Sequence, residues 1–347
     1  MLKRYMLLVV LVIGAWPAAA QDGVPKGDRV LVIDVSEGEG EEYDTVFMMG
    51  MDMGMQQVGM SMDWTDIETA PGVYDGSMLE IINIYFPAFG MPVDFTIRPI
   101  HTGTLRVPDD LANTRLDDPE MIARFNALLD FAFATMPDVE FSSVSIGSEF
   151  DGYLGDNADL WAQYTVLATA AADHVRELRP GTPIAFEAMY FTGFQGASAP
   201  YLRALNEYAD IIGVSYYPLD GNMQVLEPAV LGEHFGALVA EYPDKPIWFY
   251  QFGYPSSPLN DSSEEAQAEF IRQAFLAWDM YPDQVIMIDF TWLTDMSDDS
   301  VAYFEEYYSY SSPEFAAFLG SLGLRYADGT PKLALDVLRE EAALRGW

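Results

Sequence analysis

The sequence predicts a single (β/α)8 barrel, in which eight parallel strands alternate with eight helices around one core. Two observations lead to this fold. From residue 21 onward, eight short β-rich runs alternate with eight segments of helical spacing, without a repeat or an internal linker. About 320 residues are available for this pattern and half of the chain is apolar, and both values suit one large barrel core.

The expected strands are short runs rich in β-branched and aromatic residues. They cover residues 30–35, 56–62, 93–99, 141–148, 184–190, 211–216, 247–251 and 285–290. The segments between them carry apolar residues at helical spacing, at residues 43–53, 78–86, 119–135, 160–178, 201–207, 228–240, 264–280 and 313–319. The tail, residues 332–344, is expected to form a further amphipathic helix that closes the barrel.

Some helix starts carry local signals. Asp118 precedes Pro119, which fits an N-cap followed by proline at the first helical position. Ser262 and Glu265 have the spacing of a capping box. We expect a loop at the acidic segment 295–299. The aromatic, acidic segment 303–310 is expected either to rim a ligand groove or to be an ordinary loop that covers the barrel.

The first twenty residues have the features of an export signal. Lys3 and Arg4 give a positive start, residues 7–13 an apolar run, and residues 18–20 a small-residue cleavage site. The apolar run is too short to span a bilayer, although an uncleaved anchor is the competing interpretation. We therefore divide the chain into a signal peptide, 1–20, and a barrel domain, 21–347. A secreted or periplasmic protein, without membrane association after cleavage, is expected.

The composition excludes several classes of function. Cysteine is absent, which excludes disulfides, thiol nucleophiles and cysteine-bound metals. Asp and Glu number 54 against 17 Lys and Arg, and such a surface repels nucleic acid and anionic membranes. A neutral ligand is therefore expected, although adaptation to salty surroundings explains the charge equally well. The three histidines are scattered and the segment 295–299 lacks calcium-loop spacing, so neither a metal nor a cofactor is expected.

The ligand site of such a barrel lies where the strands end and the loops begin. That rule selects Asp63, Trp64, Arg98, His101, Glu149, Asp151, Tyr190, Tyr216, Tyr217, Gln251 and Trp292. These are carboxylates, aromatic residues and amides. Sugars require such residue types, because their apolar ring faces stack on aromatic rings and their hydroxyls pair with polar side chains.

Three motifs lie at these strand ends. They are Ser-Ile-Gly-Ser-Glu149-Phe-Asp151, Pro-Ile-Trp-Phe-Tyr-Gln251-Phe-Gly-Tyr-Pro-Ser-Ser, and Asp63-Trp64-Thr-Asp-Ile-Glu68 with Pro71-Gly72-Val-Tyr74-Asp75. Together they resemble the clan A glycoside hydrolases, and galactanase-like secreted barrels most of all. The resemblance covers nearly the whole mature chain.

The resemblance implies a catalytic role for Glu149 and a change at Gln251. In the clan, the glutamate that ends strand four is the general acid/base, which this resemblance carries onto Glu149. The nucleophilic glutamate ends strand seven, where this sequence has Gln251. An amide cannot form the glycosyl ester of a retaining mechanism. The asparagine that usually precedes the acid/base is also replaced, by Ser148.

Three accounts of this replacement remain open. Another carboxylate activates water and gives inversion, and the candidates are Asp289, Asp295, Glu187 and Asp151. Alternatively, the substrate supplies its own nucleophile, as an acetamido sugar can, and Gln251 orients that group. In the third account the barrel has lost hydrolysis and only binds glycan.

The substrate-binding residues expected beside Glu149 and Gln251 are Trp64, Arg98, Asp151, Tyr190, Tyr216 and Trp292. Trp292 is expected to be a sugar platform, with a plug of the barrel top as the alternative. Arg98 pairs either with a site carboxylate or within a loop salt bridge. Strand alternation allows only one of Tyr216 and Tyr217 to face inward.

Methionines are concentrated between residues 48 and 62. Met48, Met51 and Met55 follow helical spacing and are expected to pack on the barrel. Copper binding by their sulfur atoms is the alternative interpretation.

Together these features predict a secreted, glycoside-hydrolase-like protein that acts on a neutral oligo- or polysaccharide, with Glu149 as general acid/base. The alternative is a catalytically inactive glycan-binding barrel. A third hypothesis, from another class, is an exported structural or assembly partner that uses the barrel surface.

Overall fold

A computed structural model describes residues 23–347. The predicted signal peptide lies outside the described residues. Within the described part of the chain, no helix is both long enough and apolar enough to cross a membrane.

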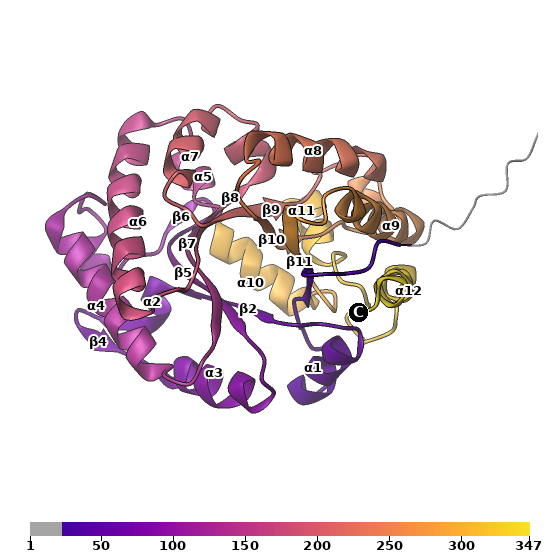
Figure 1. Cartoon of the computed structure of the whole chain (residues 1–347), viewed down its shortest axis with the longest axis horizontal. Coiled ribbons are helices and arrows are strands. Elements are labelled where there is room, and N and C mark those ends of the chain that lie inside the picture. Colours follow the sequence, from indigo (N-terminus) through magenta and orange to yellow (C-terminus); the bar gives the residue numbers. More distant parts are fainter. Residues whose placement is uncertain (1–22) are drawn as a thin grey trace, which may run out of the picture.

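Eight parallel strands form the sheet predicted from the sequence (Figure 1). In their order across the sheet they are β1 (Val30–Ile33), β11 (Val285–Phe290), β10 (Ile247–Phe252), β9 (Ile211–Tyr216), β8 (Ile184–Met189), β7 (Phe141–Ser148), β5 (Val93–His101) and β2 (Val58–Asp63). The short β6 (Thr104–Leu105) pairs antiparallel with β5, and β3 (Glu68–Ala70) pairs with β4 (Val73–Tyr74) outside this sheet. The two end strands approach each other where the Gln56 N–H donates to the Leu31 carbonyl (3.0 Å).

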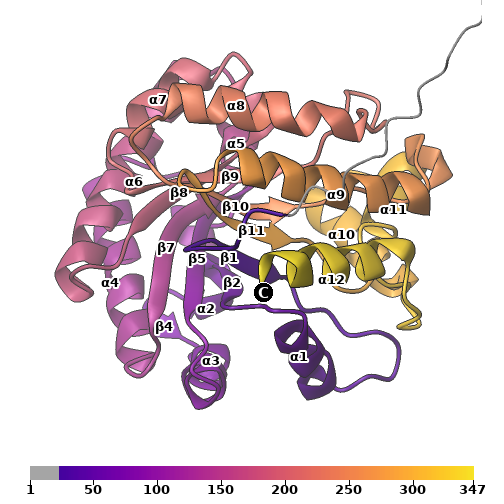
Figure 2. The same cartoon turned by 45° about the vertical axis from the view of Figure 1, so that its right-hand side comes forward.

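Helices surround the sheet, as the strict alternation predicts. They are α1 (Tyr43–Asp52), α2 (Trp64–Ile67), α3 (Ser77–Ala88), α4 (Pro119–Thr135), α5 (Asp151–Leu154), α6 (Ala158–Leu178), α7 (Ala199–Asn206), α8 (Leu231–Glu241), α9 (Glu264–Met280), α10 (Asp298–Tyr308), α11 (Pro313–Leu319) and α12 (Leu333–Arg345), with the short turns η1 (Asp109–Leu111), η2 (Tyr190–Phe194), η3 (Pro228–Val230) and η4 (Pro258–Asn260). In Figure 2, α12 lies beside α9 near β1, so the tail helix closes the barrel as predicted.

The capping signals are confirmed at one helix and displaced at another. Asp118 accepts a hydrogen bond from the Glu120 N–H, with Pro119 as the first helical residue of α4. For α9, the predicted cap Ser262 is wrong by one residue. Ser263 has the extended backbone that an N-cap needs, and its hydroxyl accepts from the Ala266 N–H.

The loop predicted at 295–299 is wrong in part, because the helix α10 begins within it at Asp298. The segment 303–310 is mostly helical rather than a loop, and its Tyr308 and Tyr310 line a cavity at the barrel mouth, in agreement with the alternative that it rims a groove. Ser297 caps the helix by accepting from the Ser300 N–H, and two aspartates occupy its first turn. Val301 is the one buried residue of this helix, and Phe304 packs in the same small hydrophobic cluster, so the apolar face of the helix is short. In Figure 1, α10 is seen in the middle of the ring of strands, drawn fainter than they are and therefore on the side of the barrel away from the viewer.

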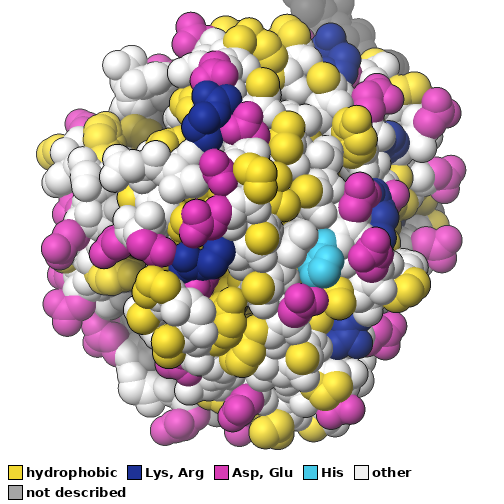
Figure 3. All heavy atoms as spheres, turned by 90° about the vertical axis from the view of Figure 1, so that its left-hand side faces the viewer, with side chains coloured by type: hydrophobic (Ala, Val, Ile, Leu, Met, Phe, Trp, Pro, Cys, Tyr) yellow, Lys and Arg dark blue, Asp and Glu magenta, His cyan; other side chains and the backbone are white. Residues whose placement is uncertain are grey.

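Side chains alternate between the two faces of each strand. One face packs against the helices, and the other faces the inside of the barrel. The large apolar core lies between sheet and helices. The inward face carries a smaller apolar cluster, with Val32, Trp248, Tyr250 and Met287, and above it several buried acids. The face covered by α4 and α6 shows acidic side chains scattered among neutral and apolar ones, with few basic ones (Figure 3).

Candidate functional site

A cavity of about 510 Å³ lies at the carboxyl ends of the strands. Its floor includes Glu149, Ser215 and Gln251, and Tyr217 and Trp292 add aromatic walls. These residues lie at the ends of β7, β9, β10 and β11, and Met189 at the end of β8, which lies between β7 and β9, also lines the cavity. The barrel rule used on the sequence therefore located the cavity correctly.

The backbone at the end of β7 turns Glu149 into this cavity. Gly147 has φ +80°, and a Cβ there would collide with the Tyr164 hydroxyl, which donates to the Ile146 carbonyl (2.6 Å). Glu149 itself has φ +51°, and its N–H donates to the Glu187 carbonyl (2.9 Å). The chain thus leaves the strand sharply and presents the carboxyl group at its end.

Both oxygens of the Glu149 carboxyl group are hydrogen-bonded by hydroxyl groups. Ser215 donates to Oε1 and Thr102 donates to Oε2, each at 2.6 Å. The side chain is 8% exposed and lines the cavity. Its orientation is therefore fixed while a face of the carboxyl group stays open to a ligand. Sequence reasoning missed Thr102 and Ser215, since small hydroxyl residues carry no distinctive signal.

Gln251 is held by three neighbours. Its Nε2 donates to Glu187 Oε1 (2.7 Å) and to the Ser148 hydroxyl (3.3 Å). Its Oε1 accepts from the Tyr217 hydroxyl (3.0 Å). Both amide hydrogens are used within the protein, and the carbonyl oxygen retains one lone pair for a ligand.

Glu187 lies behind Gln251 and is 2% exposed. Burial, followed by the charge on Glu149, raises the pKa of Glu187 to about 8. The group is therefore protonated at neutral pH and cannot accept a proton from water there. Of the four carboxylates considered as a second catalytic group, it is the one that contacts Gln251.

The other three candidate carboxylates are held away from the cavity. Asp151 accepts from the Thr192 hydroxyl (2.5 Å) and the Met189 N–H, and burial raises its pKa to about 7. Asp289 faces the barrel interior, where burial raises its pKa well above the usual range. Asp295 is paired with Lys332 (2.7 Å). None of the three lines the cavity.

Within residues 23–347, the carboxylates that line the cavity are Glu149 and Asp220. Asp220 is exposed, in the loop after β9. It accepts from the N–H groups of Asn222 and Gln224, and these hydrogen bonds lower its pKa. Asp220 is therefore a weak base that already serves as the cap of its own turn.

Four predicted binding residues do not line the cavity: Asp151 and Arg98, and the aromatic residues Trp64 and Tyr216, which are buried outside it. Trp64 is fully buried against Phe125, and its indole N–H donates to Glu68 (2.7 Å). The strand-to-helix turn at α2 directs this ring inward, so no ring surface is left for a ligand. Tyr216 is likewise fully buried, with its hydroxyl against His234 (2.7 Å). Strand alternation places its neighbour Tyr217 in the cavity instead.

Arg98 takes part in an ion-pair network that anchors α10, rather than lining the cavity. Its Nε contacts Asp63 Oδ1 (2.7 Å), and the Tyr307 hydroxyl of α10 donates to Asp63 Oδ2 (2.7 Å). Arg106 lies over the Tyr307 ring, 3.6 Å from its centroid, and His101 Nδ1 lies 2.5 Å from its hydroxyl. Burial, assisted by the two arginines, lowers the pKa of His101 to about 2, so this imidazole is neutral.

Tyr190 and Trp292 both line the cavity, as predicted from their positions at strand ends. Tyr190 is almost fully buried, whereas Trp292 is half-buried. Trp292 also lines a neighbouring cavity of about 380 Å³ bounded by Glu37 and Ser300. Its side chain lies near Asp34. The Trp292 indole therefore lies between two cavities.

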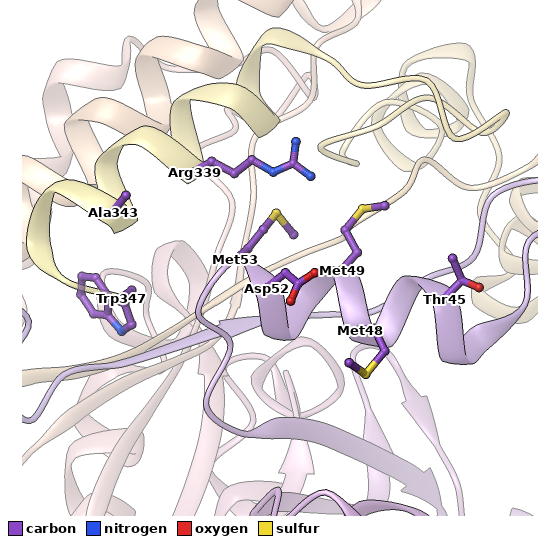
Figure 4. Close-up of a pocket in the computed structure, with 8 residues that line it drawn as sticks. All are labelled: Thr45, Met48, Met49, Asp52, Met53, Arg339, Ala343 and Trp347. Carbon is purple, nitrogen blue, oxygen red and sulfur yellow. The ribbon is translucent and has the colours of Figure 1, made fainter.

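A separate cavity of about 520 Å³ lies between α1 and α12 (Figure 4). Met49 and Met53 point toward Arg339, whereas Met48 points to the other side of α1. Met48 is 44% exposed, so its predicted packing on the barrel is wrong, while Met55 is buried as predicted. Because the sulfur atoms diverge, the arrangement does not favour copper. In the part of the chain described, no cluster of three or more His, Asp or Glu side chains could hold a metal ion.

Comparison with known proteins finds solved structures of similar fold but no matching sequence family. No protein-family model matches the chain, and no curated protein matches it. The solved structures similar to it include the exo-β-1,4-mannosidase Op5Man5 from Opitutaceae bacterium strain TAV5, at TM-score 0.71 and 16% identity over 91% of this chain and 59% of that one. This chain therefore spans less than two thirds of the mannosidase.

Two further structures cover more of their own length. A GH5_18 protein from Bifidobacterium longum subsp. longum in complex with Manβ1-4GlcNAc has a TM-score of 0.72 at 13% identity, over 91% of this chain and 78% of that one. The GH53 catalytic domain from Ignisphaera aggregans has a TM-score of 0.63 at 18% identity, over 91% and 97%. The chain thus has the barrel fold of clan A glycoside hydrolases, as predicted.

Proposed function

We propose that the cavity at the barrel mouth binds a neutral glycan and that Glu149 acts there as the general acid. The observation that carries this proposal is the Glu149 carboxyl group itself. It is oriented by two hydroxyl donors on the floor of an aromatic-lined cavity. A general acid has to reach the leaving oxygen within hydrogen-bonding distance, and a fixed, ligand-facing carboxyl group meets that need.

Besides Glu149, the carboxylate on the cavity wall is Asp220, which is a weak base because it already caps its own turn. The amide of Gln251 cannot attack the sugar, and Glu187 behind it is protonated at neutral pH. Inversion through Asp151, Asp289 or Asp295 loses support, because these groups lie outside the cavity. The remaining catalytic route uses a nucleophile from the substrate.

An acetamido group beside the reacting carbon can supply that nucleophile. Its carbonyl oxygen attacks the anomeric carbon while Glu149 transfers its proton to the leaving oxygen. Water then opens the cyclic intermediate, and the Glu149 carboxylate accepts a proton from that water. The free lone pair on Gln251 Oε1 is suited to accept the acetamido N–H, which would hold the group in place.

Glycan binding without hydrolysis is the second candidate function. The replacement of the nucleophile by Gln251 favours it, since the cavity and its aromatic walls do not depend on that oxygen. The two candidates make the same prediction for binding and opposite predictions for turnover.

A glycoside panel with three proteins separates these functions. The panel contains β-mannosides, because one structural neighbour is an exo-β-1,4-mannosidase, together with β-galactosides, β-glucosides and N-acetyl-β-glucosaminides. Wild type, Glu149→Gln and Gln251→Glu are compared, with Glu80→Gln on the exposed face of α3 as the matched control. Product anomers are followed by NMR.

Hydrolysis confined to acetamido sugars, reduced by about a hundredfold or more in Glu149→Gln, supports the catalytic proposal. Retaining activity that appears only in Gln251→Glu, together with glycan binding by wild type, supports the binding-only function. Inverting hydrolysis by wild type contradicts both, because it requires a second carboxylate that acts on water. A lack of both binding and hydrolysis across the panel contradicts a glycan-directed function altogether.

A further inference from the structure

The cavity at the barrel mouth has two chemically different sides. The strand ends contribute the polar groups of Thr102, Glu149, Ser215 and Gln251. Another part of the lining is apolar. We call it the α11 wall, and it consists of Leu219, Met223, Phe315, Phe318, Leu319 and Leu322. One cavity therefore presents hydrogen-bonding groups at its floor and hydrocarbon at its side.

The α11 wall is not part of the main core. Its residues belong to a small hydrophobic cluster above the barrel, separate from the core between sheet and helices. Phe318, Leu319 and Leu322 are buried at its base, whereas Leu219, Met223 and Phe315 are half-buried at the cavity surface. Soluble proteins seldom keep a contiguous apolar surface in a cavity unless something binds there.

Four of the six wall residues are aliphatic, and aliphatic side chains are poor partners for a sugar. A hydroxyl group placed against leucine or methionine loses its hydrogen bonds to water and gains none in return. A sugar ring favours a flat aromatic face with polar groups at its edge, which Trp292 and the cavity floor can offer. The α11 wall suits hydrocarbon instead, because burying apolar surface on both partners is favourable.

We propose that the bound glycoside has an apolar hydrocarbon aglycone, and that the α11 wall binds this aglycone while the sugar lies at Glu149. The inference rests on the proposed glycan-binding function and names the substrate class of that site. The general acid protonates the oxygen that joins sugar to aglycone, so the aglycone begins next to Glu149 and can continue along the same cavity. The volume of about 510 Å³ is in the range that holds a ligand of drug size, which suits a small glycoside rather than a polymer.

Paired glycosides test this inference by calorimetry. For each sugar of the panel, the methyl, octyl and triethylene-glycol glycosides are compared, all below the micelle concentration of the octyl compound. The Glu149→Gln protein is used, so that no substrate is consumed. The octyl glycoside is expected to bind at least about tenfold more tightly than the methyl glycoside, since several methylene groups leave water. The triethylene-glycol glycoside, of similar length but polar, is expected to bind like the methyl one.

Two wall variants and one control locate the effect. Phe315→Ser and Leu219→Ser, each in the Glu149→Gln background, are expected to remove most of the octyl preference and to keep the methyl affinity. Methyl affinity shows that each variant still folds around an intact sugar site. Ile84→Ser removes an apolar side chain that is 73% exposed on α3, and is expected to change neither affinity.

The outcomes separate this inference from the function on which it rests. Equal affinity for methyl and octyl glycosides overturns the inference and leaves the glycan-binding function intact. An octyl preference that survives both wall variants also overturns it, because the chain then binds elsewhere. Equal binding of octyl compounds whatever their sugar, or no binding of any glycoside, overturns the glycan-binding function and the inference with it.

Discussion

Asp94→Asn should stabilise the protein, and the gain should grow as the pH rises. Asp94 lies on the inward face of β5, is 3% exposed, and accepts one hydrogen bond, from Gln57 Nε2 (3.1 Å). Burial, followed by the charge on Glu187, raises its pKa from 3.8 to about 8. Asparagine keeps the shape of the side chain and can accept the same hydrogen bond, but it has no charge to bury.

The sign follows from the raised pKa. Below pH 3.8 the carboxyl group is protonated in both the folded and the unfolded chain, so its burial costs no ionisation. Between this value and about pH 8 the unfolded chain releases a proton that the folded chain keeps. The free energy of unfolding then falls by about 1.4 kcal/mol per pH unit. At pH 7, about three units above the unfolded pKa, the loss is roughly 4 kcal/mol as an upper bound.

Equilibrium urea denaturation, followed by tryptophan fluorescence at pH 4.5, 5.5, 6.5 and 7.5, measures this difference. Asp94→Asn should gain up to about 4 kcal/mol over wild type near neutral pH and about 1 kcal/mol or less at pH 4.5. Asp244→Asn, an exposed change of equal charge in the loop before β10, is the control and should show a small effect. A gain for Asp94→Asn that is the same at every pH, or a loss at pH 7.5, would refute this reasoning.

Three further predictions concern the site, its cover and the destination of the protein. Trp292→Ala should weaken oligosaccharide binding by about 1 to 3 kcal/mol with little change in thermal stability, measured by calorimetry and thermal unfolding; a large loss of stability at unchanged affinity would indicate a barrel plug instead. Tyr307→Phe removes the hydroxyl that donates to Asp63, and hydrogen exchange in α10 should become faster while the strands keep their protection; unchanged exchange would show that the helix is held by other contacts. Cell fractionation should find a mature protein outside the cytoplasm that begins near Gln21; a full-length cytoplasmic chain would exclude export.

The strand pattern could be predicted well because each strand buries one face against the helices. Residues 141–148, 211–216 and 285–290 form strands with the predicted bounds, and α4, α9 and α11 begin and end where expected. These segments have strong apolar periodicity between clear breakers, so local sequence and tertiary packing agree. The position of Glu149 at the barrel mouth followed from the strand pattern and the barrel rule together.

The helix α10 was not predicted because contacts with residues far away in the sequence hold it in place. Its apolar stripe is short, with Val301, Phe304 and Tyr308 at helical spacing, and only Val301 is buried. What fixes it on the barrel is Tyr307, which contacts Asp63, His101 and Arg106 from other strands and loops. A contact between residues more than two hundred positions apart produces no periodic pattern in the sequence, so the pattern could not predict this contact.

The sequence by itself determined the barrel, the strand ends and the presence of an amide, Gln251, at one of those ends, because periodicity, chain length and residue identity are properties of the chain alone. Only the tertiary structure decided which strand-end side chains meet. Trp64 and Tyr216 are as aromatic as Tyr217, yet they point into the core, since one step along a strand or helix turn reverses the direction of a side chain. The protonation of Glu187 was decided in the same way, because burial and the neighbouring Glu149 set its pKa, and both depend on residues far apart in the chain.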